Sequence, residues 1–159
     1  MNNTLFMSPL PKRSGFKPNI SSSGPHAQLS DQSSPELWGR LIFESIAMEH
    51  VVEGRSSVSP LTSRALLFDD ISAIISPETS LSPTEPLEPV HIHGFHDTSI
   101  HACLPIKRVL EVCLTGWGES HAHADHETEI MIYGPRNEEE LEVVLGLIRE
   151  SLNFARKNN

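Results

Sequence analysis

Apolar residues recur every three or four positions in two segments of the chain, which is the spacing of an amphipathic helix. The first segment opens with Ser34–Pro35–Glu36, where a capping hydroxyl precedes proline and an acid, and it ends near His50. The second follows Asn137 and Glu140, which resemble a capping box, and it has the strongest helical period of the chain. Its apolar positions are Leu141, Val144, Leu145, Ile148 and Leu152. We expect a helix in each segment.

Shorter segments alternate between apolar and polar residues or are wholly apolar, as β-strands are. We expect strands at Arg64–Phe68, Val90–His93, Ser99–Leu104 and Thr128–Tyr133, with the middle two joined as a hairpin. Pro105 opens a further helix that Gly116 closes. Its expected apolar face consists of Ile106, Val109, Leu110 and Cys113. The pattern predicts an α+β fold: a single small domain with a short, mainly antiparallel sheet packed by two or three helices.

Two segments lack an apolar period. The first 34 residues contain eight serines and four prolines, a composition that buries too little surface to offset the entropy lost on ordering. We therefore expect residues 1–24 to form a flexible N-terminal arm and residues 25–159 to form the folded domain. Ser76–Pro89 holds four prolines, and we expect an ordered crossing or a surface loop there.

The net charge of −9 is unevenly distributed along the chain. Lys12, Arg13 and Lys17 against Asp31 give the first 34 residues a charge of +2, which leaves −11 for residues 35–159. A folded part this acidic repels phosphate backbones, so we expect no nucleic-acid partner. A small-molecule substrate or ligand, neutral or cationic, or a basic protein suits this charge better.

Cysteine content and hydropathy restrict the cellular setting. Cys103 and Cys113 lie among apolar neighbours and are too few for a disulfide framework. No segment approaches the roughly 20 apolar residues of a membrane span, and residues 1–13 lack the basic start and apolar stretch of a secretory signal. We expect no membrane association and a cytoplasmic location. We interpret Cys103 as buried and structural rather than as a nucleophile beside His101.

Seven of the nine histidines lie between His91 and His126. His91 and His93 share one face of a strand, and a hairpin partner would bring His101 toward them. Imidazoles on paired strands suit a facial set of metal ligands, with His101 or His121 as the third member. The alternative is a half-exposed polar face whose imidazoles bond to neighbours or to water. Both interpretations stay open, and no metal ligand is assigned.

The second histidine group, His121–Ala–His123–Ala–Asp125–His126, matches the H-x-H-x-D-H pattern of metallo-β-lactamase-type hydrolases. Those enzymes have much longer chains, with further histidine and aspartate ligands after this motif. Only 33 residues follow His126 here, and none is histidine or aspartate. We therefore exclude that class of hydrolase.

Three separated motifs resemble the luciferase-domain family. They are H-x-H-G-x-x-D-T-S-I-H-x-x-L-P at His91–Pro105, G-W-G-E-S-H at Gly116–His121 and Y-G-P-R-x-E-E-E-L-E-V-V at Tyr133–Val144. Two shorter stretches, Pro25–Leu29 and Arg55–Ser59, also fit. The resemblance extends from about Pro25 to Lys157, with the motifs in the family's order.

The family is named for the luciferase of luminous mushrooms and includes many short, uncharacterised proteins. The mushroom enzyme oxidises a hydroxylated α-pyrone with molecular oxygen and releases carbon dioxide and light, with no established organic cofactor. The resemblance thus implies an oxygenase-type enzyme acting on a small electron-rich enol or phenol, and it leaves the cofactor unknown. Asp97–Thr98–Ser99 stands where the family has Asp-Gly-Ser, and Ala122 replaces an expected proline. Because of these departures, we do not extend the expectation to light emission.

Positions that match the family pattern imply catalytic roles. His101 or His121 would be the base that makes the substrate anion, because a neutral imidazole suits that task near pH 7. Asp97 or Glu119 would orient that imidazole by accepting its second N–H. His93 would donate a hydrogen bond to the developing oxyanion.

Trp117, Tyr133 and Arg136 are the expected substrate-binding residues, Trp117 by stacking on a planar ring and Arg136 by holding an anionic group. Structural roles compete with these assignments. Trp117 would instead pack in the core over a tight turn. Asp97 would only form the hairpin turn, and Arg136 would only pair with nearby glutamates. Two other functions also stay open: a non-catalytic module of the same fold that binds a small molecule or a protein, and an enzyme that uses a metal held by the histidines.

Overall fold

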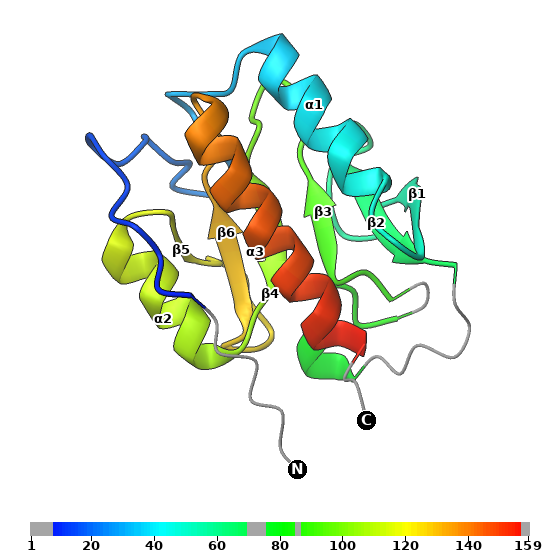
Figure 1. Cartoon of the computed structure of the whole chain (residues 1–159). Coiled ribbons are helices and arrows are strands. Elements are labelled where there is room, and N and C mark those ends of the chain that lie inside the picture. The colour runs from blue at the N-terminus through cyan, green and yellow to red at the C-terminus, as the bar shows by residue number, and fades with distance from the viewer. Residues whose placement is uncertain (1–7, 70–75, 85–86, 157–159) are drawn as a thin grey trace.

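The computed structural model describes residues 8–69, 76–84 and 87–156. Their helices are α1 (Pro35–Ile46), α2 (Ile106–Thr115) and α3 (Glu138–Arg156), with a short 3-10 helix at Pro77–Thr79 (Figure 1). The strands are β1 (Val51–Arg55), β2 (Arg64–Phe68), β3 (Val90–Ile92), β4 (Ile100–Cys103), β5 (Gly118–Ser120) and β6 (Glu129–Ile132). Residues 1–7 of the expected arm and residues 85 and 86 of the expected crossing lie outside the described residues.

The strands form one antiparallel sheet in the order β1-β2-β3-β4-β6-β5. His91 of β3 lies opposite Ala65 of β2 on one side and His101 of β4 on the other. The same row continues to Met131 of β6 and Glu119 of β5. Residues in register point to the same face of a sheet, so these five side chains form one row. The predicted α+β fold, with a short antiparallel sheet and three helices, is confirmed.

The opposite face of the sheet carries the apolar core. Ile92, Ile100 and Ala102 are fully buried and belong to one cluster with Leu141 and Ile148 of α3. Figure 1 shows α1 and α3 running across this face of the sheet. The histidines of β3 and β4 therefore point away from the two longest helices.

The helix ends follow the capping signals in the sequence. The Ser34 hydroxyl accepts a hydrogen bond from the Leu37 N–H at 3.2 Å, and the Asn137 side chain accepts one from the Glu140 N–H at 2.9 Å. Gly116 ends α2 in the left-handed conformation, with a φ of 83°. In the described part of the chain, no helix is both long and apolar enough to cross a membrane.

The buried face of α2 differs from the expected one. Val109 is buried as expected, but Ile106 and Leu110 are 48% and 58% exposed. Arg108 is instead almost fully buried, because its guanidinium donates two hydrogen bonds to Glu150 of α3 at 2.6 and 2.7 Å. This ion pair turns an arginine toward the domain and leaves two apolar side chains at the surface.

Residues 8–24, within the expected arm, lie against the domain. Arg13 is 5% exposed, and its guanidinium bonds to Glu140 of α3 at 3.3 Å. The Trp117 indole N–H donates to the Pro11 carbonyl at 2.6 Å. The expected boundary at residue 24 stays a prediction. It implies that residues 8–24 add little to the stability of the domain, and a substitution at Arg13 tests this.

Candidate functional site

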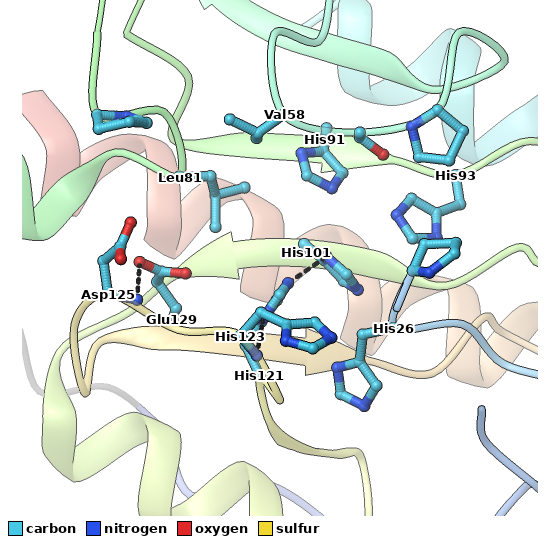
Figure 2. Close-up of a pocket in the computed structure, with 14 residues that line it drawn as sticks. His26, Val58, Leu81, His91, His93, His101, His121, His123, Asp125 and Glu129 are labelled. Atoms are coloured by element: carbon cyan, nitrogen blue, oxygen red, sulfur yellow. Dashed lines mark hydrogen bonds between the residues drawn. The ribbon is translucent and has the colours of Figure 1, made fainter. Parts of the chain in front are cut away.

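A cavity of about 280 Å³ opens on the histidine-bearing face of the sheet. Figure 2 shows His91 and His101 on neighbouring strands, with His121 beyond His101 and His26 contributed by the N-terminal segment. Val58, Leu81 and several prolines complete the wall. The cavity therefore joins parts of the chain that are far apart in sequence.

Strand alternation places the first three histidines. Ile92 and Ile100 point into the core, so His91 and His101 point to the other face, where their rings lie 4.9 Å apart between centroids. His93 follows β3 directly and keeps the alternation. Its ring stacks on that of His91 at a centroid distance of 5.2 Å and an angle of 10°.

His91 is held by a buried carboxylate. Its Nδ1 lies 2.8 Å from Oε1 of Glu88, which also accepts hydrogen bonds from the Ser56 hydroxyl and the Ser57 N–H. Burial raises the pKa of Glu88, but the hydrogen bonds from His91, Ser57 and Ser56 outweigh it and lower the pKa below 4.5. Burial lowers the pKa of His91. A neutral His91 therefore donates from Nδ1 to an ionised Glu88 and keeps the lone pair of Nε2.

His93 has the same arrangement with a different acid. Its Nδ1 bonds to Oδ2 of Asp97, whose other oxygen accepts from the Gln28 N–H at 2.8 Å and the Ser99 hydroxyl at 2.6 Å. Burial raises the pKa of Asp97, but the hydrogen bonds from His93, Ser99 and Gln28 outweigh it and lower the pKa. His93 therefore donates from Nδ1 and leaves Nε2 as an acceptor beside the cavity.

A hydrogen-bond chain fixes the protons of His101 and His121. The backbone N–H of His123 donates to Nδ1 of His121 at 3.0 Å, so a neutral His121 carries its proton on Nε2. That Nε2 lies 2.8 Å from Nδ1 of His101, which must accept (Figure 2). His101 then carries its proton on Nε2, where it has no partner among the described residues although it is buried.

Electrostatics keep this chain neutral. Burial and, after it, the neighbouring imidazoles, with His26 first, lower the pKa of His121 to about 4. Burial also lowers the pKa of His101 well below 6.5, as do the neighbouring imidazoles. Both rings are therefore neutral at pH 7, with the tautomers that the hydrogen bonds specify.

His26 and Glu119 form a separate pair beside the cavity. The Ala122 N–H donates to Nδ1 of His26 at 3.2 Å, so His26 donates from Nε2 to Glu119 at 3.1 Å. The second oxygen of Glu119 accepts from the Tyr133 hydroxyl at 2.8 Å. Burial raises the pKa of Tyr133, and this hydrogen bond raises it further. Glu119 thus orients His26, rather than His101 or His121.

None of the three expected substrate-binding residues lines the cavity. Trp117 is 3% exposed and belongs to the apolar core cluster, with its N–H bound to a backbone carbonyl. Arg136 pairs with Glu140 through Nε at 3.0 Å and donates to the Ser14 carbonyl at 2.6 Å. Tyr133 is fully buried and reaches the site only through Glu119. These contacts match the structural alternatives for Trp117 and Arg136.

His26, Glu88 and His91 are site residues that the sequence-based assignment omitted. His91 had a signal, because it alternates with His93 and pairs with His101 across the hairpin. Glu88 lies three residues before His91, a spacing that has no special meaning outside a helix. His26 reaches its partner Glu119 across 93 residues, and its signal in the sequence was its place in Pro25–Leu29, a stretch that fits the family pattern.

Comparison with known proteins shows which family this part of the chain resembles. The family model described as a luciferase domain matches residues 86–151. This part of the chain is similar to the luciferase-domain family. The matched part contains five of the cavity's histidines and both carboxylates that hold His91 and His93.

The similar curated proteins are fungal luciferases. Those of Armillaria ostoyae and Armillaria gallica are 40% identical to this chain over 73 residues, which is 42% of this chain and 27% of each relative. That of Neonothopanus nambi is 26% identical over 168 residues, which is 94% of this chain and 62% of the relative. The chain thus spans less than two thirds of the length of these relatives. No solved structure matches the chain.

Proposed function

We propose that this luciferase domain is an oxygenase-type enzyme that binds a small electron-rich enol or phenol, such as a hydroxylated pyrone, in the histidine cavity. The observation that carries the proposal is His93, whose Nδ1 is held by Asp97 and whose Nε2 is an acceptor beside the cavity. A carboxylate behind an imidazole fixes the tautomer and stabilises the imidazolium that forms on proton transfer. The relatives named luciferase support a reaction with dioxygen.

The hydrogen bonds favour roles that differ from those inferred from the motifs. His93 accepts the proton of the substrate hydroxyl, because its Nε2 has a lone pair. His101 donates from its buried Nε2–H to the resulting oxyanion, since its Nδ1 is occupied by His121. His121 fixes the tautomer of His101.

The proposed reaction has two steps in which the protein moves one proton. His93 first takes the hydroxyl proton and leaves the substrate as an enolate or phenolate. A carbon of that anion then forms a bond to dioxygen, and the outer oxygen of the resulting peroxide takes the proton back from His93. The sum is the addition of one dioxygen molecule to one substrate molecule, which leaves the protein unchanged.

The remaining assigned residues support the cavity from outside. Glu119 holds His26 and Tyr133, and in this proposal it shapes the wall without touching the substrate. Trp117 and Arg136 stabilise the junction with the N-terminal segment. The partner is therefore a small molecule that enters between the histidines.

Charge and cysteine chemistry support the proposed setting. The net charge of −9 disfavours a nucleic-acid partner. Cys103 is fully buried, and burial raises the pKa of its thiol, so it is protonated and unreactive at pH 7. Neither cysteine is in a disulfide. A reducing cytoplasmic location fits this chemistry, and we include it in the proposal.

The test is oxygen consumption by chelator-treated protein given hydroxylated pyrones or catechol-like compounds. In a protein that consumes oxygen with one of them, His93→Gln should lower kcat by about 100-fold or more, which is the usual contribution of a general base. His101→Gln should also lower kcat, because the oxyanion loses its donor. His96→Gln is the matched control, since His96 is exposed and lies outside the cavity.

Two results would contradict the proposal in different ways. Turnover of His93→Gln within about threefold of the parent would remove His93 as the base. Binding of these compounds to the parent protein without oxygen consumption would favour the alternative function, a non-catalytic small-molecule binding module.

A further inference from the structure

Three imidazoles present unused ring nitrogens to the same small space. One nitrogen from each of His91, His93 and His101 lies within 4.8 Å of the other two. Nε2 of His91 and Nε2 of His101 are buried without a hydrogen-bond partner in the part of the chain that the structure describes. A buried polar atom without a partner is costly to keep, so two such nitrogens beside the free nitrogen of a third imidazole indicate a site for a ligand.

The surroundings of two of these rings are those of metal ligands. Histidines that bind a metal usually donate their second N–H to a carboxylate or a carbonyl, which fixes the ring and raises its basicity. Glu88 does this for His91 and Asp97 does it for His93, both through Nδ1. Because Nδ1 is used in both rings, Nε2 is the nitrogen whose lone pair is available to a ligand.

We propose that His91, His93 and His101 bind one divalent transition-metal ion through their Nε2 atoms. Three neutral imidazoles suit zinc, iron, copper or nickel, whereas magnesium and calcium prefer oxygen ligands. The remaining coordination positions would face the cavity, where a small molecule reaches them. Binding at three strand-borne side chains needs no change of the sheet, since His91 and His101 are already paired in register.

A second group of histidines does not compete for the ion. His26 and His121 each use both ring nitrogens in hydrogen bonds, to Glu119, to His101 and to backbone N–H groups. Ligation by His101 changes this second group through the shared hydrogen bond. His101 must move its proton from Nε2 to Nδ1, and His121 must then move its own proton from Nε2 to Nδ1. Both rings stay neutral, and His121 gives up the hydrogen bond from His123.

Metal binding goes beyond the proposed reaction and does not depend on it. The ion would take the lone pair of His93 that the proposed reaction uses for the proton, so zinc should suppress turnover if that base assignment is right. Turnover that requires the metal would keep the metal site and overturn the base assignment. An experiment can therefore overturn the metal site or the assignment of His93 as the base without overturning the other.

The experiment is calorimetric titration of chelator-treated full-length protein with zinc chloride, without substrate. We expect one equivalent to bind and to raise the melting temperature, with EDTA reversing the rise. His91→Gln and His101→Gln should weaken binding by more than about 100-fold, and Glu88→Gln and Asp97→Asn by about 10–100-fold. His96→Gln and His123→Gln are the controls, because both side chains are exposed, and they should bind as the parent does.

Cobalt and NMR measurements on the parent protein keep the test independent of variant folding. Cobalt should give the visible absorption of a nitrogen-ligated ion, and zinc should move the ring protons of His101 and His121 from Nε2 to Nδ1 in histidine NMR spectra. Absence of zinc binding to the parent would overturn the proposal. So would binding that survives His91→Gln but is lost in His123→Gln, because the ion would then lie in the exposed loop.

Discussion

Arg13 tests whether the N-terminal segment is part of the folded domain. Its side chain is 5% exposed and lies between α3 and the aromatic residues at the end of the sheet. The guanidinium bonds to Glu140 at 3.3 Å and lies 5.3 Å from the ring centroid of Tyr133 and 5.9 Å from that of Trp117. The substitution Arg13→Ala removes all of these contacts and leaves the backbone of the segment unchanged.

The expected cost follows from two contributions. Loss of a hydrogen bond to a charged group destabilises by about 1.5–3 kcal/mol. Loss of a partly buried cation–π contact adds about 0.5–2 kcal/mol. Glu140 keeps its hydrogen bonds from Arg136, so its charge does not become unpaired. We therefore expect Arg13→Ala to lower the free energy of unfolding by about 2–5 kcal/mol, without the further cost of leaving a charge buried and unpaired.

The measurement is urea denaturation followed by tryptophan fluorescence, since Trp117 lies beside Arg13. Lys12→Ala is the matched control: the neighbouring residue has the same charge, is exposed and should change stability by less than about 0.5 kcal/mol. If Arg13→Ala also changes stability by less than that amount, residues 8–24 are a dispensable arm as the composition predicts, and our reasoning from the contacts is wrong.

Three further substitutions test the core, the ion pairs and the edge strand. Ile148→Ala should lower the free energy of unfolding by about 2–5 kcal/mol in denaturation experiments, because Ile148 is fully buried in α3. Burial raises the pKa of Glu140, but the hydrogen bonds from Arg136 outweigh it and lower the pKa below 4.5. The stabilisation that ionised Glu140 provides is therefore complete above pH 4.5 and is lost as the pH falls through its lowered pKa. Glu140→Gln should lower the melting temperature at pH 7, and by progressively less in thermal melts at acid pH. Gly118→Ala should lower the melting temperature, because its Cβ would lie 2.1 Å from the Met131 carbonyl oxygen.

Most elements were predictable because their signals are local. The capping residue Ser34 and the left-handed Gly116 mark helix boundaries that depend on a few neighbouring residues. Strands β1 and β5 were not predicted, and the segment around Trp117 that leads into β5 was expected to be a turn. Strand β5 has three residues, too few to show an alternating pattern, and its first residue is Gly118. That glycine allows the close approach of β6, which only the assembled sheet reveals.

The candidate site was predictable only where the sheet itself determines it. Alternation along β3 and β4 predicts that His91, His93 and His101 gather on one face, and the register confirms the pairing of His91 with His101. The orientation of the Glu88 side chain depends on its hydrogen bonds to Ser56 and the neighbouring residue. Ser56 lies 32 residues before Glu88 in the sequence. No sequence period encodes contacts of this kind, so the acid that orients His91 becomes visible only in the fold.

In the row of side chains that contains His91 and His101, the flanking residues are apolar: Ala65 lies beside His91 and Met131 beside His101. The sheet therefore does not need a polar residue at His101, whose buried Nε2–H has no partner in the described part of the chain. An unsatisfied buried donor costs about 1–3 kcal/mol, whereas methionine would fill a similar volume with apolar atoms. His121 would lose its acceptor, but it is only half-buried, so water can replace that bond. We expect His101→Met to raise the free energy of unfolding by about 1 kcal/mol while abolishing zinc binding and turnover, the usual exchange of stability for function. A loss of more than about 1 kcal/mol in denaturation would mean that His101 serves the fold rather than the chemistry of the cavity.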